Sequence, residues 1–114
     1  MGLAFSHCEA AWAYSGFANF RRELWNLAGF DGDLYALYPR GHEVARNHPL
    51  WALFNHSDCD GVLTPIELET ILPELKRLVP MLAYGFDGYD QDMGAELIKG
   101  MELALSRAEN LQFH

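Results

Sequence analysis

One short segment, NHSDCDGVLTPIELE over residues 55–69, holds most of the side chains that could do chemistry. An EF-hand loop has oxygen ligands at positions 1, 3, 5, 7 and 9, a turn-forming glycine at 6 and a bidentate glutamate at 12. If Gly61 takes position 6, Asp58 and Asp60 fall at positions 3 and 5. Glu67 then falls at position 12. The spacing therefore predicts a divalent-cation site.

The other ligand positions agree less closely with a calcium loop. Val62 would offer its backbone carbonyl at position 7, and the hydroxyl of Thr64 would reach the ion through water at position 9. His56 stands at position 1, and imidazole suits Zn²⁺, Mn²⁺ or Ni²⁺ better than Ca²⁺. If the loop is one residue longer, the Asn55 amide takes that role. We expect Ca²⁺ first, with Mg²⁺, Mn²⁺ or Zn²⁺ as alternatives. The predicted ligands are His56, Asp58, Asp60, Val62, Thr64 and Glu67.

Two other interpretations of this segment remain. DCDGVLT resembles the nucleophile motif of haloacid-dehalogenase-type phosphatases, but the preceding LFNHS is too short and polar for their buried strand, and only 54 residues follow Asp60. The plainer alternative is that Thr64 and Glu67 only cap a helix. Capping leaves unexplained why Asp58 and Asp60 are crowded into one tight turn, where their charges repel unless a cation or amide donors offset them.

Further polar residues could complete a different site. Asn55, His7 and His114 form a possible additional polar site beside the loop. If the histidines and aspartates converge, the chain could be a small metal-dependent hydrolase or a protein that sequesters a nucleotide. Cys8 and Cys59 with nearby histidines could hold zinc, since zinc prefers N and S ligands. No motif assembles a catalytic constellation around them, so we expect the protein not to be an enzyme.

Composition limits the class of partner. The chain has 114 residues, half of them hydrophobic, which suits a single domain over residues 1–114 with a real core. Its net charge of -8 repels phosphate backbones, so direct nucleic-acid binding is not expected, whereas a cation or a basic protein surface would suit it. We find no signal peptide and no apolar run long enough for a membrane span, which predicts a cytoplasmic protein.

The apolar spacing predicts helices throughout. An amphipathic helix is expected from a Ser15 cap to a left-handed Gly29, followed by a short helix in DLYALY and two turns in HPLWALFNH. After the loop, Thr64, Pro65 and Glu67 predict a capped helix start, with a kink or break at Pro73. Residues 80–90 are expected to be a loop.

The last helix should begin at Asp90 or Asp92 and end near Glu109, with Phe113 docking the tail. Since no segment alternates with a period of two, the predicted fold is all-α, a single compact domain of four to five helices with one EF-hand-like helix–loop–helix.

Several segments resemble a family of short proteins associated with phages, prophages and their bacterial hosts. They are Ser6 with His7, YSGFANFRREL, LFNHSDCDG and the closing Phe113 with His114. The chain departs near SHCEAAW, where such relatives tend to carry a glycine and a tryptophan. The resemblance carries over no catalytic residue. It implies a mobile-element setting, in which a protein of phage type acts in the cytoplasm of the bacterial host. In that setting we expect the protein to bind a host protein, for instance as an inhibitor of host defence.

Overall fold

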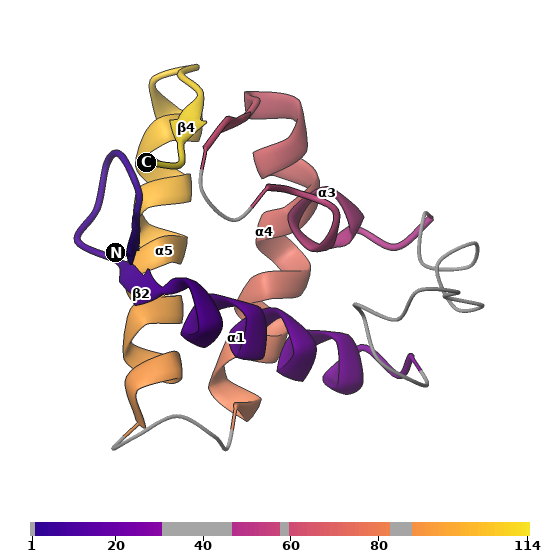
Figure 1. Cartoon of the computed structure of the whole chain (residues 1–114). Helices are drawn as coiled ribbons and strands as arrows, with labels where there is room; N and C mark the ends of the chain where they lie inside the picture. The colour runs from indigo at the N-terminus through magenta and orange to yellow at the C-terminus, as the bar shows by residue number, and fades with distance from the viewer. Residues whose placement is uncertain (1, 31–46, 58–59, 83–87) are drawn as a thin grey trace.

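The computed structural model describes residues 2–30, 47–57, 60–82 and 88–114. Within these ranges it contains four α-helices and two small antiparallel sheets (Figure 1). The elements in chain order are β1 (Gly2–Ala4), β2 (Ala11–Ala13), α1 (Tyr14–Leu27), α3 (Trp51–Phe54), β3 (Val62–Leu63), α4 (Pro65–Leu78), a 3₁₀ turn η1 (Val79–Met81), α5 (Tyr89–Ser106) and β4 (Leu111–Gln112).

The predicted all-α class is wrong, because the described part of the chain is a mixture of helices and sheets. The strands are two or three residues long, too short for an alternating pattern to show. The helix expected in DLYALY lies outside the described residues, and the two turns expected around Trp51 shorten to one.

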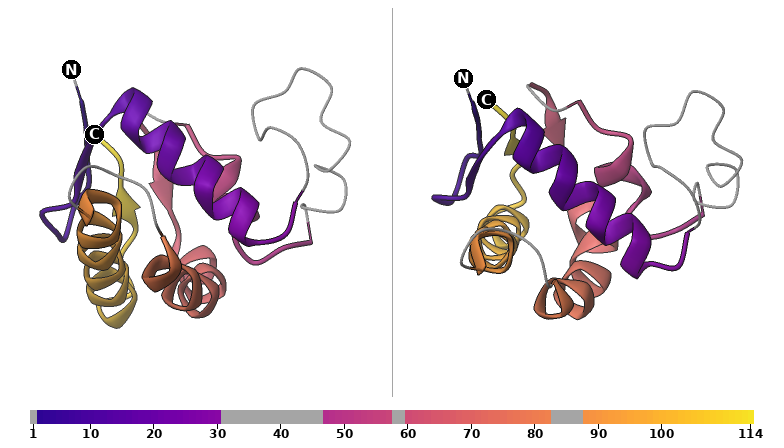
Figure 2. Two further views of the ribbon diagram at one scale, coloured as in Figure 1. Left: turned by 90° about the horizontal axis from the view of Figure 1, so that it is seen from below. Right: turned by 60° about the horizontal axis from the view of Figure 1, so that its bottom comes forward.

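The strands bring the two ends of the sequence together. β1 pairs with β2, and β3 pairs with β4. Ala4 and His114 exchange backbone hydrogen bonds of 3.1 and 2.9 Å, and Phe5 lies opposite Phe113 in a bridge between the two sheets. The segment after Leu111 therefore runs between the first strand and the loop, so that N and C lie close together in Figures 1 and 2.

Helix α1 ends as the sequence predicts but begins differently. Gly29 has a φ of 93°, its N–H bonds to the Asn26 carbonyl, and the Phe30 N–H bonds to the Trp25 carbonyl. This is a Schellman ending, and the Trp25 and Phe30 rings pack 4.5 Å apart across it. The predicted Ser15 cap is wrong, because Ser15 lies inside the first turn.

Helix α4 confirms the predicted capping box and disproves the predicted break. Thr64 and Glu67 bond reciprocally, and Pro65 stands at the first helical position. The helix continues past Pro73 to Leu78. A helix-interior proline costs about 3 kcal/mol. Burial of the apolar stripe offsets this, since each fully buried leucine or isoleucine contributes about 1.5–3 kcal/mol. The buried residues are Leu68, Ile71, Leu72, Leu75 and Leu78.

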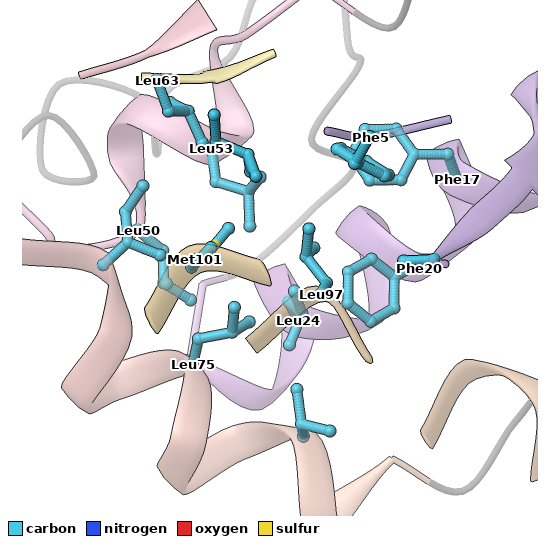
Figure 3. Packing of buried hydrophobic residues seen from close by; sticks show 14 of the residues in the cluster. Phe5, Phe17, Phe20, Leu24, Leu50, Leu53, Leu63, Leu75, Leu97 and Met101 are labelled. Carbon is cyan, nitrogen blue, oxygen red and sulfur yellow. The ribbon is translucent and has the colours of Figure 1, made fainter. Parts of the chain in front are cut away.

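The core lies where α1 crosses α4 and α5, which run antiparallel to each other (Figures 1 and 2). Side chains from all three helices and from α3 meet there, as Figure 3 shows for Leu24, Leu53, Leu75, Leu97 and Met101. Helix α5 begins one residue before the predicted start and ends three before the predicted end. None of the described helices combines the length and apolar character that would let it cross a bilayer.

Candidate cation-binding loop

The backbone of the loop has the shape that its sequence predicts from the glycine onwards. Gly61 has a φ of 95°, a left-handed conformation that a side chain would strain. Val62 and Leu63 follow as β3, Thr64 caps the helix, and α4 begins at Pro65. β3 pairs with β4, so the tail of the same chain supports this loop.

The His56 ring fills the inside of this turn. Its Nε2 lies 2.9 Å from the Val62 carbonyl oxygen, and its Nδ1 lies 2.8 Å from that of Ser57. A carbonyl only accepts, so the ring nitrogens are the donors; neutral imidazole carries one N–H, while the protonated ring carries two. A Cβ added to Gly61 would stand 3.2 Å from the ring carbon Cε1, which is a second reason for glycine there.

The same ring is held from its other side by the tail. The ring centroids of His56 and Phe113 are 3.9 Å apart, with the planes 26° from parallel. Phe113 is buried and donates its backbone N–H to the Gly61 carbonyl at 2.9 Å. It also packs edge-on against Phe5 at 4.7 Å. Phe113 therefore docks the tail, as predicted, and ties the loop to the first strand.

Glu67, the predicted closing ligand, is engaged in helix capping. Its Oε1 accepts from the Thr64 backbone N–H at 2.9 Å and from the Thr64 hydroxyl at 3.0 Å. The Glu67 N–H in turn donates to the Thr64 hydroxyl at 3.4 Å. A carboxylate has a second oxygen with its own acceptor capacity, so capping and cation binding do not exclude each other.

Only part of the predicted ligand set can be placed. Asp60 is exposed beside the turn, while Asp58 and Cys59 lie outside the described residues. Among the residues that are described, no three His, Cys, Asp or Glu side chains form a group that could hold a metal ion. The Gly61 turn and the Val62 carbonyl fit a cation loop, whereas His56 has both ring nitrogens directed at backbone carbonyls.

Arg21 positions the loop, although it is not among the residues predicted from the sequence. The side chain is buried, and Nη1 donates to the Leu53 carbonyl at 3.1 Å and to the His56 carbonyl at 2.6 Å. It also lies 4.6 Å above the Phe17 ring. Arg21 thus satisfies carbonyls at the end of α3, where a helix leaves such groups without partners. The spacing placed this residue off the apolar stripe of α1, so nothing in the sequence marked it.

The residues of the possible additional polar site make separate contacts. His7 Nδ1 lies 2.7 Å from the Ser6 hydroxyl, and His7 Nε2 lies 3.1 Å from Glu109 Oε1. His114 is exposed and bonds to the first strand through its backbone, while Asn55 is exposed at the end of α3. His7, His56 and His114 all lie along the tail, but the described contacts do not join their side chains.

Two titratable groups with raised pKa values lie away from the loop. Burial raises the pKa of Asp90, although the Trp12 indole N–H, donated at 3.1 Å, opposes that rise. Burial also raises the pKa of the free Cys8 thiol, which packs against Gly100. A thiol with a raised pKa is a poor nucleophile, so this environment does not favour catalysis by Cys8.

A hollow of about 520 Å³ lies over the β1–β2 hairpin and has no predicted site residue in its wall. It is lined by Gly2, Leu3, Ala4, Ala11, Trp12, Ala13 and Tyr89.

Comparison with family models, curated proteins and solved structures gives no match to this chain. Its function therefore has to be inferred from its own residues.

Proposed function

We propose that this is a small acidic protein that binds a divalent cation, Ca²⁺ first, in the loop over residues 56–67, and that it acts non-enzymatically by binding another protein. The main support for the proposal is the conformation of the loop backbone. Gly61 makes the left-handed turn, the Val62 carbonyl faces the inside of the loop, where it meets His56, and α4 begins at the expected distance.

The ligand chemistry supports a hard cation. The carboxylates of Asp58, Asp60 and Glu67 and the Val62 carbonyl are oxygen donors, which suit Ca²⁺ or Mg²⁺; Thr64 would contribute through water. Ligation by a His56 nitrogen would instead favour Mn²⁺ or Zn²⁺. A bound cation would offset the repulsion among the carboxylates and stabilise the folded chain.

A protein partner is supported by the surface beside the loop. Ile66 is 78% exposed and Val62 is 38% exposed, so the segment that carries the exposed Asp60 also carries two exposed apolar side chains. The net charge of -8 favours a partner with a basic surface. The resemblance to phage-associated proteins makes a bacterial host protein, such as a defence factor, our proposed partner. A hydrolase or a nucleotide-sequestering protein is less well supported, because the histidines contact separate groups.

Cation binding is tested with protein freed of metal by a chelator. We expect Ca²⁺ at a hundred times its Kd to stabilise the fold by about 2.7 kcal/mol, which corresponds to a rise in Tm of about 10 °C. Asp60→Asn and Glu67→Gln should weaken binding measured by calorimetry, and Gln at 67 keeps the capping oxygen. Glu69→Gln, an exposed neighbour on α4, is the matched control. Equal Tm in Ca²⁺ and in EDTA, with no heat of binding, would contradict the proposal.

The protein partner is tested by affinity capture from a bacterial lysate with the wild type and with Ile66→Asp. We expect one partner to be retained by the wild type, released by salt and lost with the variant, while the variant keeps its Tm. Capture that is the same for both proteins would contradict this surface assignment.

A further inference from the structure

The His56 ring competes with a cation for the Val62 carbonyl. In an EF-hand loop, the backbone carbonyl at position 7 is a ligand of the ion. Here that carbonyl accepts from His56 Nε2 at 2.9 Å, and the ring lies against the Gly61 turn. The ring therefore donates a hydrogen bond to the same oxygen that a cation in the loop would coordinate.

We propose that His56 limits the affinity of the loop by acting as a built-in substitute for the cation, and that cation binding requires its ring to leave the turn. This inference rests on the proposed cation-binding function. The ring cannot ligate through Nε2 while that nitrogen donates to Val62, and a second carbonyl, that of Ser57, holds Nδ1 at 2.8 Å. His56 is therefore a specificity-determining residue of this loop and not one of its resident ligands.

Displacement of the ring would be felt in the tail. Phe113 stacks on His56 with a centroid separation of 3.9 Å, and its N–H donates to the carbonyl of Gly61. When the ring leaves, Phe113 keeps its edge contacts with Phe5 and Phe17 but loses its stacked partner. The chemical environment of Phe113 thus reports the position of His56.

The expected affinity changes follow from the contacts that must break. Both hydrogen-bonding contacts of the ring must break before the ion can take its place. His56→Ala removes both ring contacts and should tighten Ca²⁺ binding about tenfold, equivalent to about 1.4 kcal/mol. His56→Asp removes the same contacts and adds a carboxylate at position 1, so it should bind Ca²⁺ more tightly than His56→Ala.

The experiment measures Ca²⁺ affinity by calorimetry for the wild type, His56→Ala and His56→Asp. The control is His48→Asn, which removes an imidazole outside the loop while keeping an acceptor for the Leu50 N–H. In parallel, NMR follows the His56 ring nitrogens and the Phe113 ring as CaCl₂ is added to the wild type. We expect the affinity order Asp, then Ala, then wild type, with both rings shifting on saturation.

Each possible result either supports the inference about His56 or overturns it. Binding by both His56→Ala and His56→Asp, with none by the wild type, would support the inference in its strongest form, with complete competition in the wild type. Binding by His56→Asp alone would show that the loop lacks a first ligand, and it would overturn the inference. Equal affinity for wild type and His56→Ala, or unmoved His56 signals at saturation, would overturn the inference and leave the proposed function standing. Weaker binding by His56→Ala would show that His56 is a ligand and would also overturn it. No binding by any of the proteins would overturn both proposals. If His56→Ala does not fold, the wild-type NMR titration decides.

Discussion

Replacing Arg21 by methionine tests how the loop is held in place. Methionine keeps the apolar stem inside the core but removes the guanidinium that donates to the Leu53 and His56 carbonyls. Hydrogen bonds from a charged donor contribute about 1.5–3 kcal/mol each, and loss of the contact over the Phe17 ring adds about 0.5–1 kcal/mol. We expect Arg21→Met to lower the free energy of unfolding by about 3.5–7 kcal/mol, out of a total of about 5–15 kcal/mol.

The assay is urea unfolding followed by tryptophan fluorescence, with the m-value checked for equality between variants. Arg22→Met is the matched control, because Arg22 is only partly buried and donates to Asn19 within its own helix. It should cost less than about 0.5 kcal/mol. Arg21→Lys should fall between the two, since an ammonium is a compact charge without the planar fork of the guanidinium.

A loss below about 1 kcal/mol for Arg21→Met, or a loss equal to that of Arg22→Met, would refute the view that Arg21 anchors the loop. If the view is correct, Arg21→Met should also weaken Ca²⁺ binding, because the backbone carbonyl of His56 is one of the two groups that Arg21 fixes. Calorimetry on the folded variant at low temperature measures that second effect separately from stability.

Three further predictions concern α5 and the tail. Gly94→Ala should destabilise the protein by about 1–3 kcal/mol in urea unfolding, because a Cβ there would stand 2.9 Å from Val79 Cγ1; Val79→Ala should recover part of that loss, and strict additivity of the two changes would contradict the stated cause. For Asp90, the folded state holds the carboxyl proton more tightly than the unfolded state, so its contribution to stability falls as pH rises above the usual Asp range. Asp90→Asn, which can still accept from Trp12, should therefore gain Tm relative to wild type between pH 4 and pH 7, and an opposite trend would contradict the raised pKa. Phe113→Ala should cost about 3–5 kcal/mol by the same unfolding assay and should broaden the NMR signals of the His56 ring, whereas unchanged His56 signals would show that the stack does not hold it.

What could be predicted from the sequence is the chemistry between near neighbours. The capping box joins Thr64 to Glu67, and the Gly29 ending joins residues within one turn, so residue type and spacing were enough. The same holds for the left-handed Gly61 in the loop. The docking of Phe113 followed from the cost of leaving a large aromatic side chain in water.

What could not be predicted depends on contacts between distant parts of the chain. The N–H of Gln112 donates to the hydroxyl of Ser6, 106 positions away, and no spacing rule connects them. The inward position of Arg21 depends on where α3 ends, and the position of His56 depends on the tail that stacks on it. Without these contacts, the sequence predicts His56 as a ligand and predicts no strands.

The position of the tail between β1 and β3 has a consequence for the chain during synthesis. Ser6 is made 106 residues before Gln112, which at about 5–20 residues per second is an interval of roughly 5 to 20 seconds. A hairpin such as β1–β2 forms in microseconds, so the nascent chain waits with one edge of β1 and one edge of β3 open to other strands. We expect ribosome-bound chains that expose the sequence only up to Asn110 to be cleaved by protease around Gly61. Chains that carry the whole sequence outside the ribosome on a linker should resist it.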